Sequence, residues 1–189
     1  AGELVAGAHA AVVRAGAEHG AERLGTTLVA LAVHHGHVVI VHVGDSRAYR
    51  LRDGELEQLT RDHTVRAELD AAGVPHATAE QARVRLDALT AYLGSGFPPG
   101  FRAATFSVMG GDRFLLCSDG VHGQLDPGAL AGALGTGTCT DAARSLVNAA
   151  NAAGGLLWRA LVAGATRESL AASLVREYGI PAERAEADT

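Results

Sequence analysis

The chain has 189 residues, of which 48% are hydrophobic and 20% are charged. This length and composition suit one folded domain, or one domain with a small appendage, and argue against wholesale disorder. All 16 basic residues are arginine, which excludes Schiff-base chemistry and a Walker-type phosphate lysine. The formal net charge of -5 and the scattered arginines disfavour a nucleic-acid surface, so we expect no nucleic-acid partner.

The cysteines and the lengths of the apolar runs bear on the compartment in which the chain works. Cys117 and Cys139 have no CxxC spacing, so we interpret both as reduced packing residues and expect a cytoplasmic protein. The longest apolar runs are much shorter than the roughly 18 to 20 residues that span a bilayer, and we expect no membrane partner. Because the chain begins with Ala1 and contains a single methionine, Met109, we expect it to be part of a longer gene product.

The first half of the chain predicts one helix followed by two hairpins. Apolar residues at helical spacing predict the helix over residues 3–20. Two β-rich runs flank a Gly-containing turn at 34–37, and their near-continuous hydrophobicity is typical of strands covered on both faces. The Asp53-Gly54 turn predicts the second hairpin. The strands expected in the two hairpins span residues 26–33, 38–43, 47–51 and 56–59.

The second half predicts a helix, two strands and an alanine-rich helical tail. The helix covers residues 64–72 and ends at Gly73, with Pro75 beyond it. The strands cover residues 102–109 and 113–117, whereas residues 76–100 carry little periodic pattern. The helices expected in the tail span residues 126–134, 140–153, 156–163, 167–178 and 181–188.

Several histidines raise the alternative of a zinc site in the first hairpin. His34 and His42 could face each other across the hairpin, while His35 and His37 lie at its turn. No cysteine or acidic residue completes a tetrahedral set there, so we disfavour zinc binding. The pair Asp62-His63 is similar to a general acid and base.

Four motifs follow one another between residues 25 and 120. They are Gly25-Thr26-Thr27, Val43-Gly44-Asp45-Ser46-Arg47-Ala48-Tyr49, Gln58-Leu59-Thr60-Arg61-Asp62-His63-Thr64 and Leu115-Leu116-Cys117-Ser118-Asp119-Gly120. Together they resemble the bacterial metal-dependent protein serine/threonine phosphatases of type 2C, and the resemblance extends from the opening helix to about Gly155. It implies an α+β fold, a four-layer α-β-β-α sandwich of antiparallel sheets that is incomplete in this chain, with a C-terminal helical segment. It also implies that Asp62-His63 lies in a loop after the second hairpin, which makes a structural hydrogen-bonding role the better interpretation of this pair.

The resemblance implies hydrolysis of phosphate monoesters in phosphoprotein substrates, with water and not a side chain as the nucleophile. Such enzymes use two Mn²⁺ or Mg²⁺ ions, hard cations that prefer carboxylate and water oxygens. Carried over residue by residue, the family pattern makes Asp119 a metal ligand and places Asp45 near an additional, weaker metal position. The alternative is that Asp119 and Asp45 only form Asx-type turns at strand ends.

The chain also departs from the family pattern in ways that bear on activity. The family's early Asp-Gly-x-Gly-Gly-His segment and its phosphate-binding arginine precede the first long helix, and neither is present here. Gly154-Gly155 is followed by Leu156-Leu157 instead of an Asp-Asn pair, and His122-Gly123 occupies a position that is often acidic. One or two carboxylates hold a pair of ions poorly, so we expect impaired catalysis. The missing strands would leave sheet edges open to self-association.

The tail carries a second, fainter resemblance and gives an alternative function. Residues 156–188 are similar to the helical half of the small peptide-binding proteins of the pyrroloquinoline quinone synthesis protein D type, which implies a peptide partner. A generic helical cap explains the same pattern. We therefore expect a phosphatase-like domain over residues 1–155 and a helical segment over 156–189. The alternative to an enzyme is a non-catalytic phosphatase-like scaffold or a peptide-recognition module.

Overall fold

The computed structural model describes residues 1–21, 24–77, 79, 82–162, 166 and 172. The chain divides into two compact units, Ala1–Gly135 and Thr136–Thr189. None of the helices in the described ranges has the length and apolar character needed to cross a membrane.

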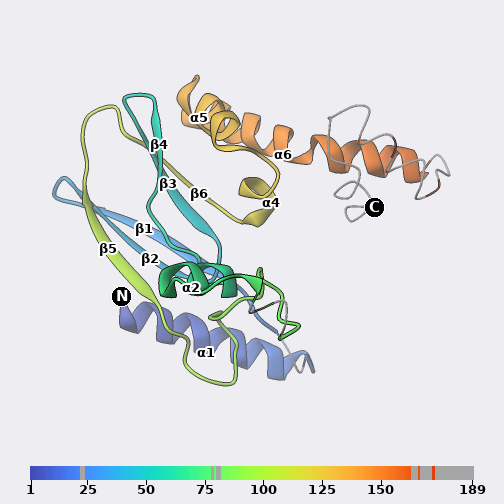
Figure 1. Cartoon of the computed structure of the whole chain (residues 1–189). Coiled ribbons are helices and arrows are strands. Elements are labelled where there is room, and N and C mark those ends of the chain that lie inside the picture. Colours follow the sequence, from blue (N-terminus) through green and yellow to red (C-terminus); the bar gives the residue numbers. More distant parts are fainter. Residues whose placement is uncertain (22–23, 78, 80–81, 163–165, 167–171, 173–189) are drawn as a thin grey trace. The chain divides into compact units, whose positions relative to one another are not determined.

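Two antiparallel three-stranded sheets form the centre of the first unit (Figure 1). Both predicted hairpins are confirmed, one in each sheet. The two later strands, although close in sequence, do not pair with each other, because one joins the first sheet and the other joins the second. The first sheet has the order β1 (Leu28–His34), β2 (His37–Val43), β5 (Arg102–Ser107), and the second has the order β4 (Glu55–Gln58), β3 (Arg47–Arg52), β6 (Arg113–Cys117).

Helices cover the outer faces of these sheets, as the sandwich architecture requires. Helix α1 (Gly2–Glu18) places Val5 in a buried cluster with Val41 and Val43 of β2. Helix α5 (Pro127–Gly135) buries Leu130 and Leu134 and contacts all three strands of the second sheet. Strand β1 also contacts β6, so the sheets lie next to each other between α1 and α5. The predicted α+β fold with an incomplete four-layer sandwich is confirmed.

The outer strands of the two sheets keep apolar side chains in solvent. Val33 of β1 is 68% exposed and Leu116 of β6 is 40% exposed, whereas Val38 and Val43 of the central strand β2 are fully buried. Edge strands of this kind offer unpaired backbone groups to another strand. Self-association through these edges stays a prediction.

The first unit has two further helices in its described part, of which the sequence predicted α2 but not α4. Helix α2 (Val65–Ala72) starts after Thr64, whose side chain accepts a hydrogen bond from the Ala67 N–H, and it ends at Gly73. The four-residue helix α4 (Asp119–His122) follows β6 directly, with Ser118 between them. The predicted end of the strand at Cys117 is therefore confirmed, and the Ser-Asp-Gly turn is the start of a short helix.

The second unit contains one long helix where the sequence predicted two. Helix α6 (Cys139–Val162) runs without a break through Gly154 and Gly155. Thr138 and Asp141 bond reciprocally at its start, where the Thr138 hydroxyl lies 2.7 Å from Asp141 Oδ2. Each glycine costs a helix only about 1 kcal/mol relative to alanine, and the Ala- and Leu-rich flanks offset that cost. The helices predicted over 167–178 and 181–188, and most of the predicted peptide-binding segment at 156–188, lie outside the described residues.

Gly94 is a point of close approach between α1 and the chain that follows α2. Its backbone has φ +89°, and its N–H donates to His9 Nδ1 at 3.2 Å. A Cβ there would lie 2.7 Å from Val12 Cγ1 and collide with the carbonyl oxygen of Leu24. Gly54, in the turn between β3 and β4, has a similar φ of +84° but open space around it.

Alanine substitutions at Gly54 and Gly94 distinguish the cost of backbone strain from the cost of a steric collision. Gly54→Ala should lower the free energy of unfolding by about 1 to 2 kcal/mol, the cost of a left-handed L-residue. Gly94→Ala should lower it by about 3 kcal/mol or more, because the collision adds to the strain. Urea unfolding followed by circular dichroism measures both, and equal losses in the two variants would show that the close packing at Gly94 is incorrect.

Candidate functional site

Strand pairing brings the two predicted metal ligands to the same end of the second sheet. Arg47, at the start of β3, pairs with Cys117, at the end of β6. Asp45 lies two residues before Arg47 and Asp119 lies two residues after Cys117. Because the strands are antiparallel, the start of β3 and the end of β6 lie at the same end of this sheet, and so do the two aspartates.

The two carboxylates line one cavity of about 470 Å³. Its other lining residues are Gly25, Thr26, Thr27, Leu89 and Tyr92. The lining of the cavity therefore includes carboxylate and hydroxyl groups as well as apolar and aromatic side chains. Among these residues, the sequence had indicated a metal-binding role for the two aspartates alone. Thr26 and Thr27 stood in a family motif without an assigned role, and Leu89 and Tyr92 come from the stretch 76–100, which has no periodic pattern.

Electrostatics in the cavity raises the pKa of Asp45. Partial burial disfavours the charged form of this carboxyl group, and the negative charge of Asp119 acts in the same direction. Neither carboxylate has an ion-pair partner within 4.0 Å in the described part of the chain. Two acidic groups that repel each other in a shared cavity form an environment that a cation would stabilise.

The turn that carries Asp45 is fixed by contacts with distant segments. Gly44 has φ +100°, and a Cβ there would lie 2.8 Å from the Cβ of Thr27 and collide with its methyl group. The Gly44 N–H donates to His63 Nδ1 at 3.1 Å, and the His63 N–H donates back to the Gly44 carbonyl at 2.9 Å. The hydroxyls of Ser46 and Thr27 lie 2.7 Å apart.

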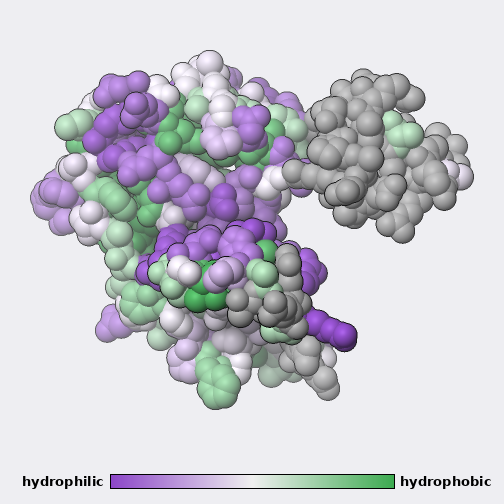
Figure 2. Space-filling model, viewed as in Figure 1, coloured by the Kyte–Doolittle hydropathy of each residue, from purple (hydrophilic) through white to green (hydrophobic). Residues whose placement is uncertain are grey.

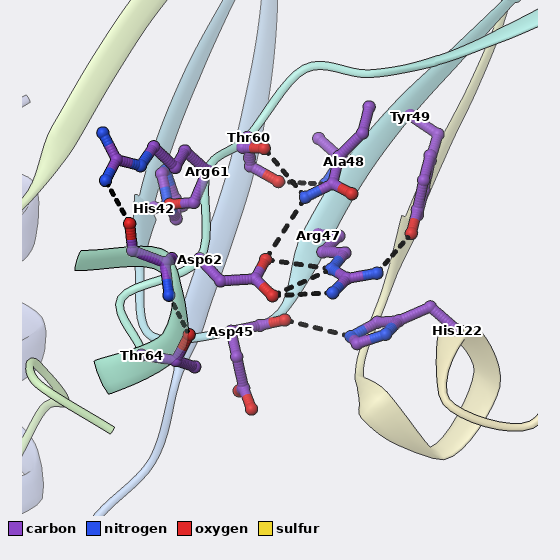
Figure 3. Close-up of polar contacts among 12 residues, drawn as sticks. His42, Asp45, Arg47, Ala48, Tyr49, Thr60, Arg61, Asp62, Thr64 and His122 are labelled. Atoms are coloured by element: carbon purple, nitrogen blue, oxygen red, sulfur yellow. Dashed lines mark hydrogen bonds and ion pairs between the residues drawn. The ribbon is translucent and has the colours of Figure 1, made fainter. Parts of the chain in front are cut away.

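A third contact joins this turn to the short helix that begins with Asp119. The Nε2 atom of His122 lies 3.0 Å from the carbonyl oxygen of Asp45 (Figure 3). In the same view the Asp45 carboxylate points away from His122. Asp119 Oδ1 accepts a hydrogen bond from the N–H of Gly120 at 2.9 Å, which orients this carboxylate within its own turn. This bond reaches the next residue and not the backbone two residues on, so it is not the Asx-type turn considered for Asp119. Asp119 is instead the first residue of α4 and lines the cavity.

Other residues of the motifs at 43–49 and 58–64 form hydrogen bonds and an ion pair with one another (Figure 3). Arg47 binds Asp62 through two nitrogens, with Nε to Oδ1 at 2.9 Å and Nη2 to Oδ2 at 2.7 Å. Arg47 Nη1 also donates to the Tyr49 hydroxyl at 3.0 Å, and the Ala48 N–H donates to Thr60 Oγ1 at 3.2 Å. The predicted structural role of Asp62-His63 is confirmed, because Asp62 pairs with Arg47 and His63 with Gly44.

A second, larger hollow beside α2 is lined by charged side chains, some of which form ion pairs. Figure 2 shows hydrophilic residues gathered around α2, where an open hollow of about 590 Å³ is lined by residues that include Arg47, Arg61 and Asp62. Arg47 is already paired with Asp62, and Arg61 lies 3.9 Å from Glu68. Arg47 and Asp62 in this hollow therefore neutralise each other.

The histidines of the first hairpin do not pair as the zinc alternative supposed. In the register of β1 and β2, His34 lies opposite His37, and His42 lies opposite Val29, so His34 and His42 do not face each other. Only His35 and Gly36 lie between the paired residues His34 and His37, whereas pairing of His34 with His42 would require a longer loop. His42 instead stacks on His63 with ring centroids 4.7 Å apart and donates from Nε2 to the Arg61 carbonyl at 2.7 Å.

The oxygen ligands of the cavity are of the kind that hard divalent cations prefer. They are too few for a centre that holds two ions. Carboxylate and water oxygens are the ligands that Mn²⁺ and Mg²⁺ prefer. Within the described ranges, however, no group of three or more histidine, cysteine, aspartate or glutamate side chains gathers at one place. Asp45 and Asp119 could hold one ion with the help of water.

Comparison with known proteins settles the family. The model of the protein phosphatase 2C family matches residues 3–164. The chain belongs to the protein phosphatase 2C family. It is 34% identical over 135 residues to the serine/threonine protein phosphatase PstP of Mycobacterium tuberculosis, covering 71% of this chain and 26% of PstP. It is 32% identical over 136 residues to the protein phosphatase PhpP of Streptococcus pneumoniae, covering 70% of this chain and 54% of PhpP.

Solved structures of this family share the fold. PppA of Pseudomonas aeruginosa, described as a key regulatory component of T6SS, superposes with a TM-score of 0.65 and 32% identity, over 77% of this chain and 60% of PppA. The catalytic domain of PstP in complex with two manganese ions superposes with a TM-score of 0.59 and 34% identity, over 75% of this chain and 59% of that domain. The chain thus spans about a quarter of full-length PstP and about half of PhpP.

The stacked histidines of this phosphatase-family domain should make its stability depend on pH. Burial lowers the pKa of His63 from its ordinary 6.5 to about 4, with His42 and Arg102 acting in the same direction and Glu68 and Asp62 opposing them. Between pH 6.5 and 4, His63 is therefore protonated in the unfolded chain and neutral in the folded chain. The free energy of unfolding falls as the pH falls through this range. The loss should be on the order of 3 kcal/mol.

The variant His63→Asn tests this dependence. Its side-chain oxygen can still accept from the Gly44 N–H, but it does not titrate, so the fall in stability between pH 6.5 and 4 should be shallower than in the unchanged chain. Urea unfolding at several pH values measures the slope, and the same exchange at the exposed hairpin turn, His35→Asn, is the control. Equal slopes in His63→Asn and the unchanged chain would contradict the assignment of His63.

Proposed function

We propose that this chain is a metal-dependent phosphatase domain that acts on phosphoserine and phosphothreonine in proteins. The observation that carries the proposal is the placement of Asp45 and Asp119 on one cavity, where the pairing of β3 with β6 brings them together. Membership of the protein phosphatase 2C family and similarity to named serine/threonine phosphatases support the reaction class.

Asp119 is the proposed principal ligand for Mn²⁺ or Mg²⁺, and Asp45 is the proposed accessory ligand. The repulsion that raises the pKa of Asp45 would be relieved by a shared cation. The two manganese ions of the PstP catalytic domain support a site of this type. When bound, such an ion activates water as the nucleophile and neutralises charge on the phosphate.

The other residues of the cavity position these groups. The bond from the Gly120 N–H restricts rotation of the Asp119 carboxylate. The contacts of Gly44 and Ser46 with His63 and Thr27 hold the backbone of Asp45. Leu89 and Tyr92 also line the cavity, and the carbon atoms of a phosphorylated side chain could pack against them.

Catalysis by this chain should be slow, because two carboxylates bind a hard cation less tightly than the larger oxygen sets of dedicated sites. Full activity would need further acidic ligands at the cavity. We also propose a cytoplasmic location, because Cys117 and the exposed Cys139 are both free thiols, as is usual in a reducing compartment.

Manganese binding and phosphate release test the proposal together. The chain should take up Mn²⁺ in isothermal titration calorimetry, and Asp119→Asn should weaken the affinity at least as much as loss of an outer-shell partner does, about 10- to 100-fold. With Mn²⁺ present, release of phosphate from a phosphothreonine peptide should be measurable but slower than about 1 s⁻¹, the lower end of ordinary enzyme turnover.

Asp53→Asn is the matched control, since Asp53 lies in the turn at the opposite end of β3 with φ +51°, a conformation that asparagine accepts well. It should leave Mn²⁺ uptake unchanged. A chain that takes up no Mn²⁺, or takes it up equally with Asp119→Asn, is not the proposed phosphatase.

A further inference from the structure

His122 links the two segments that carry the candidate ligands. It lies three residues after Asp119 in the single turn of α4, and 77 residues separate it from Asp45, whose carbonyl oxygen it contacts. A carbonyl oxygen can only accept, so His122 Nε2 must carry the hydrogen of this 3.0 Å bond. The bond therefore crosses directly from the Asp119 helix to the Asp45 turn.

The two ends of this link are anchored unequally. The Asp45 turn is already fixed to the first sheet through the contacts of Gly44 and Ser46 with His63 and Thr27. Helix α4 has one turn, and the side chain of its N-cap residue Ser118 makes no capping bond. The orientation of α4, and with it the position of Asp119, therefore depends strongly on contacts that α4 makes outside itself.

Repulsion between the carboxylates makes such a link necessary. Asp45 and Asp119 line the same cavity, and two negative charges held in one cavity repel each other. Without a constraint, α4 could turn its carboxylate away from Asp45. His122 bonds the main chain of Asp45, so it opposes this movement and leaves the Asp45 carboxylate available to a cation (Figure 3).

We propose that His122 is a positioning residue that sets the spacing between the Asp45 and Asp119 carboxylates so that both act on one divalent cation. This inference rests on the proposed function. Outer-shell partners of metal ligands elsewhere affect affinity about 10- to 100-fold. His122 differs from the usual outer-shell partner because it holds the backbone of one ligand from the helix of the other.

The test compares two replacements of His122 that differ in their hydrogen-bond donor. Glutamine places an amide N–H near the position of Nε2, whereas phenylalanine keeps a ring of similar size without a donor. His122→Phe should weaken Mn²⁺ binding about 10-fold or more, and His122→Gln should retain an affinity within about 3-fold of the unchanged chain. The affinity is measured by titrating Mn²⁺ and following the electron paramagnetic resonance signal of the free ion.

The ligand variant Asp119→Asn gives a second readout that loss of stability alone would not change. In the unchanged chain this substitution should reduce Mn²⁺ affinity strongly, and in the His122→Phe background its further effect should be much smaller, since the two carboxylates no longer share the ion. His19→Phe is the matched control, because His19 Nδ1 makes a comparable 2.9 Å contact with the Ala15 carbonyl at the end of α1. It should leave Mn²⁺ affinity unchanged.

The outcomes separate this inference from the proposed function. If the unchanged chain binds no Mn²⁺, the proposed function fails and the inference fails with it. If Mn²⁺ binds and is lost with Asp119→Asn, but His122→Phe binds as tightly as the unchanged chain, the function stands and the role of His122 is overturned. The role is overturned as well if His122→Gln and His122→Phe lose affinity equally.

Discussion

The connection from β2 to β3 is the constraint on which both the fold and the candidate site depend. At Gly44 the chain leaves the first sheet, and at Arg47 it enters the second. The left-handed backbone of Gly44 and the close packing of Thr27 leave no room for a side chain there. Asp45 lies inside this connection, so the geometry that joins the two sheets also presents its carboxylate to the cavity.

Charge is distributed differently in the scaffold and in the cavity. Arg47 pairs with Asp62, and Arg52 pairs with Asp112 at 2.6 Å, with the Asp112 side chain only 1% exposed. Buried charges of this kind are stable because each has a partner of opposite sign. Asp45 and Asp119 share a cavity without such a partner among the described residues. Folding alone does not favour that arrangement, which is why it indicates a binding function.

Local patterns in the sequence were sufficient for the hairpins and for the position of Asp119, because turn chemistry and strand ends are encoded within a few residues. The assignment of β5 and β6 to different sheets could not be predicted, since it depends on pairing across the whole domain. The bond between His122 and Asp45 spans 77 residues, and no spacing rule relates them. The sequence predicts two helices on either side of Gly154-Gly155, whereas the long helix α6 tolerates both glycines.

The bonds that build the site are independent of any cation. Gly44 bonds His63, Arg47 bonds Asp62, and His122 bonds the Asp45 carbonyl, so each contact joins two groups of the protein. This differs from a structural zinc site, where metal binding itself supplies the free energy of folding. At the proposed site, the fold would be the precondition for metal binding. The proposed cation affinity would therefore vary with the number of acidic groups that reach the cavity, while the surrounding α+β sandwich stays the same.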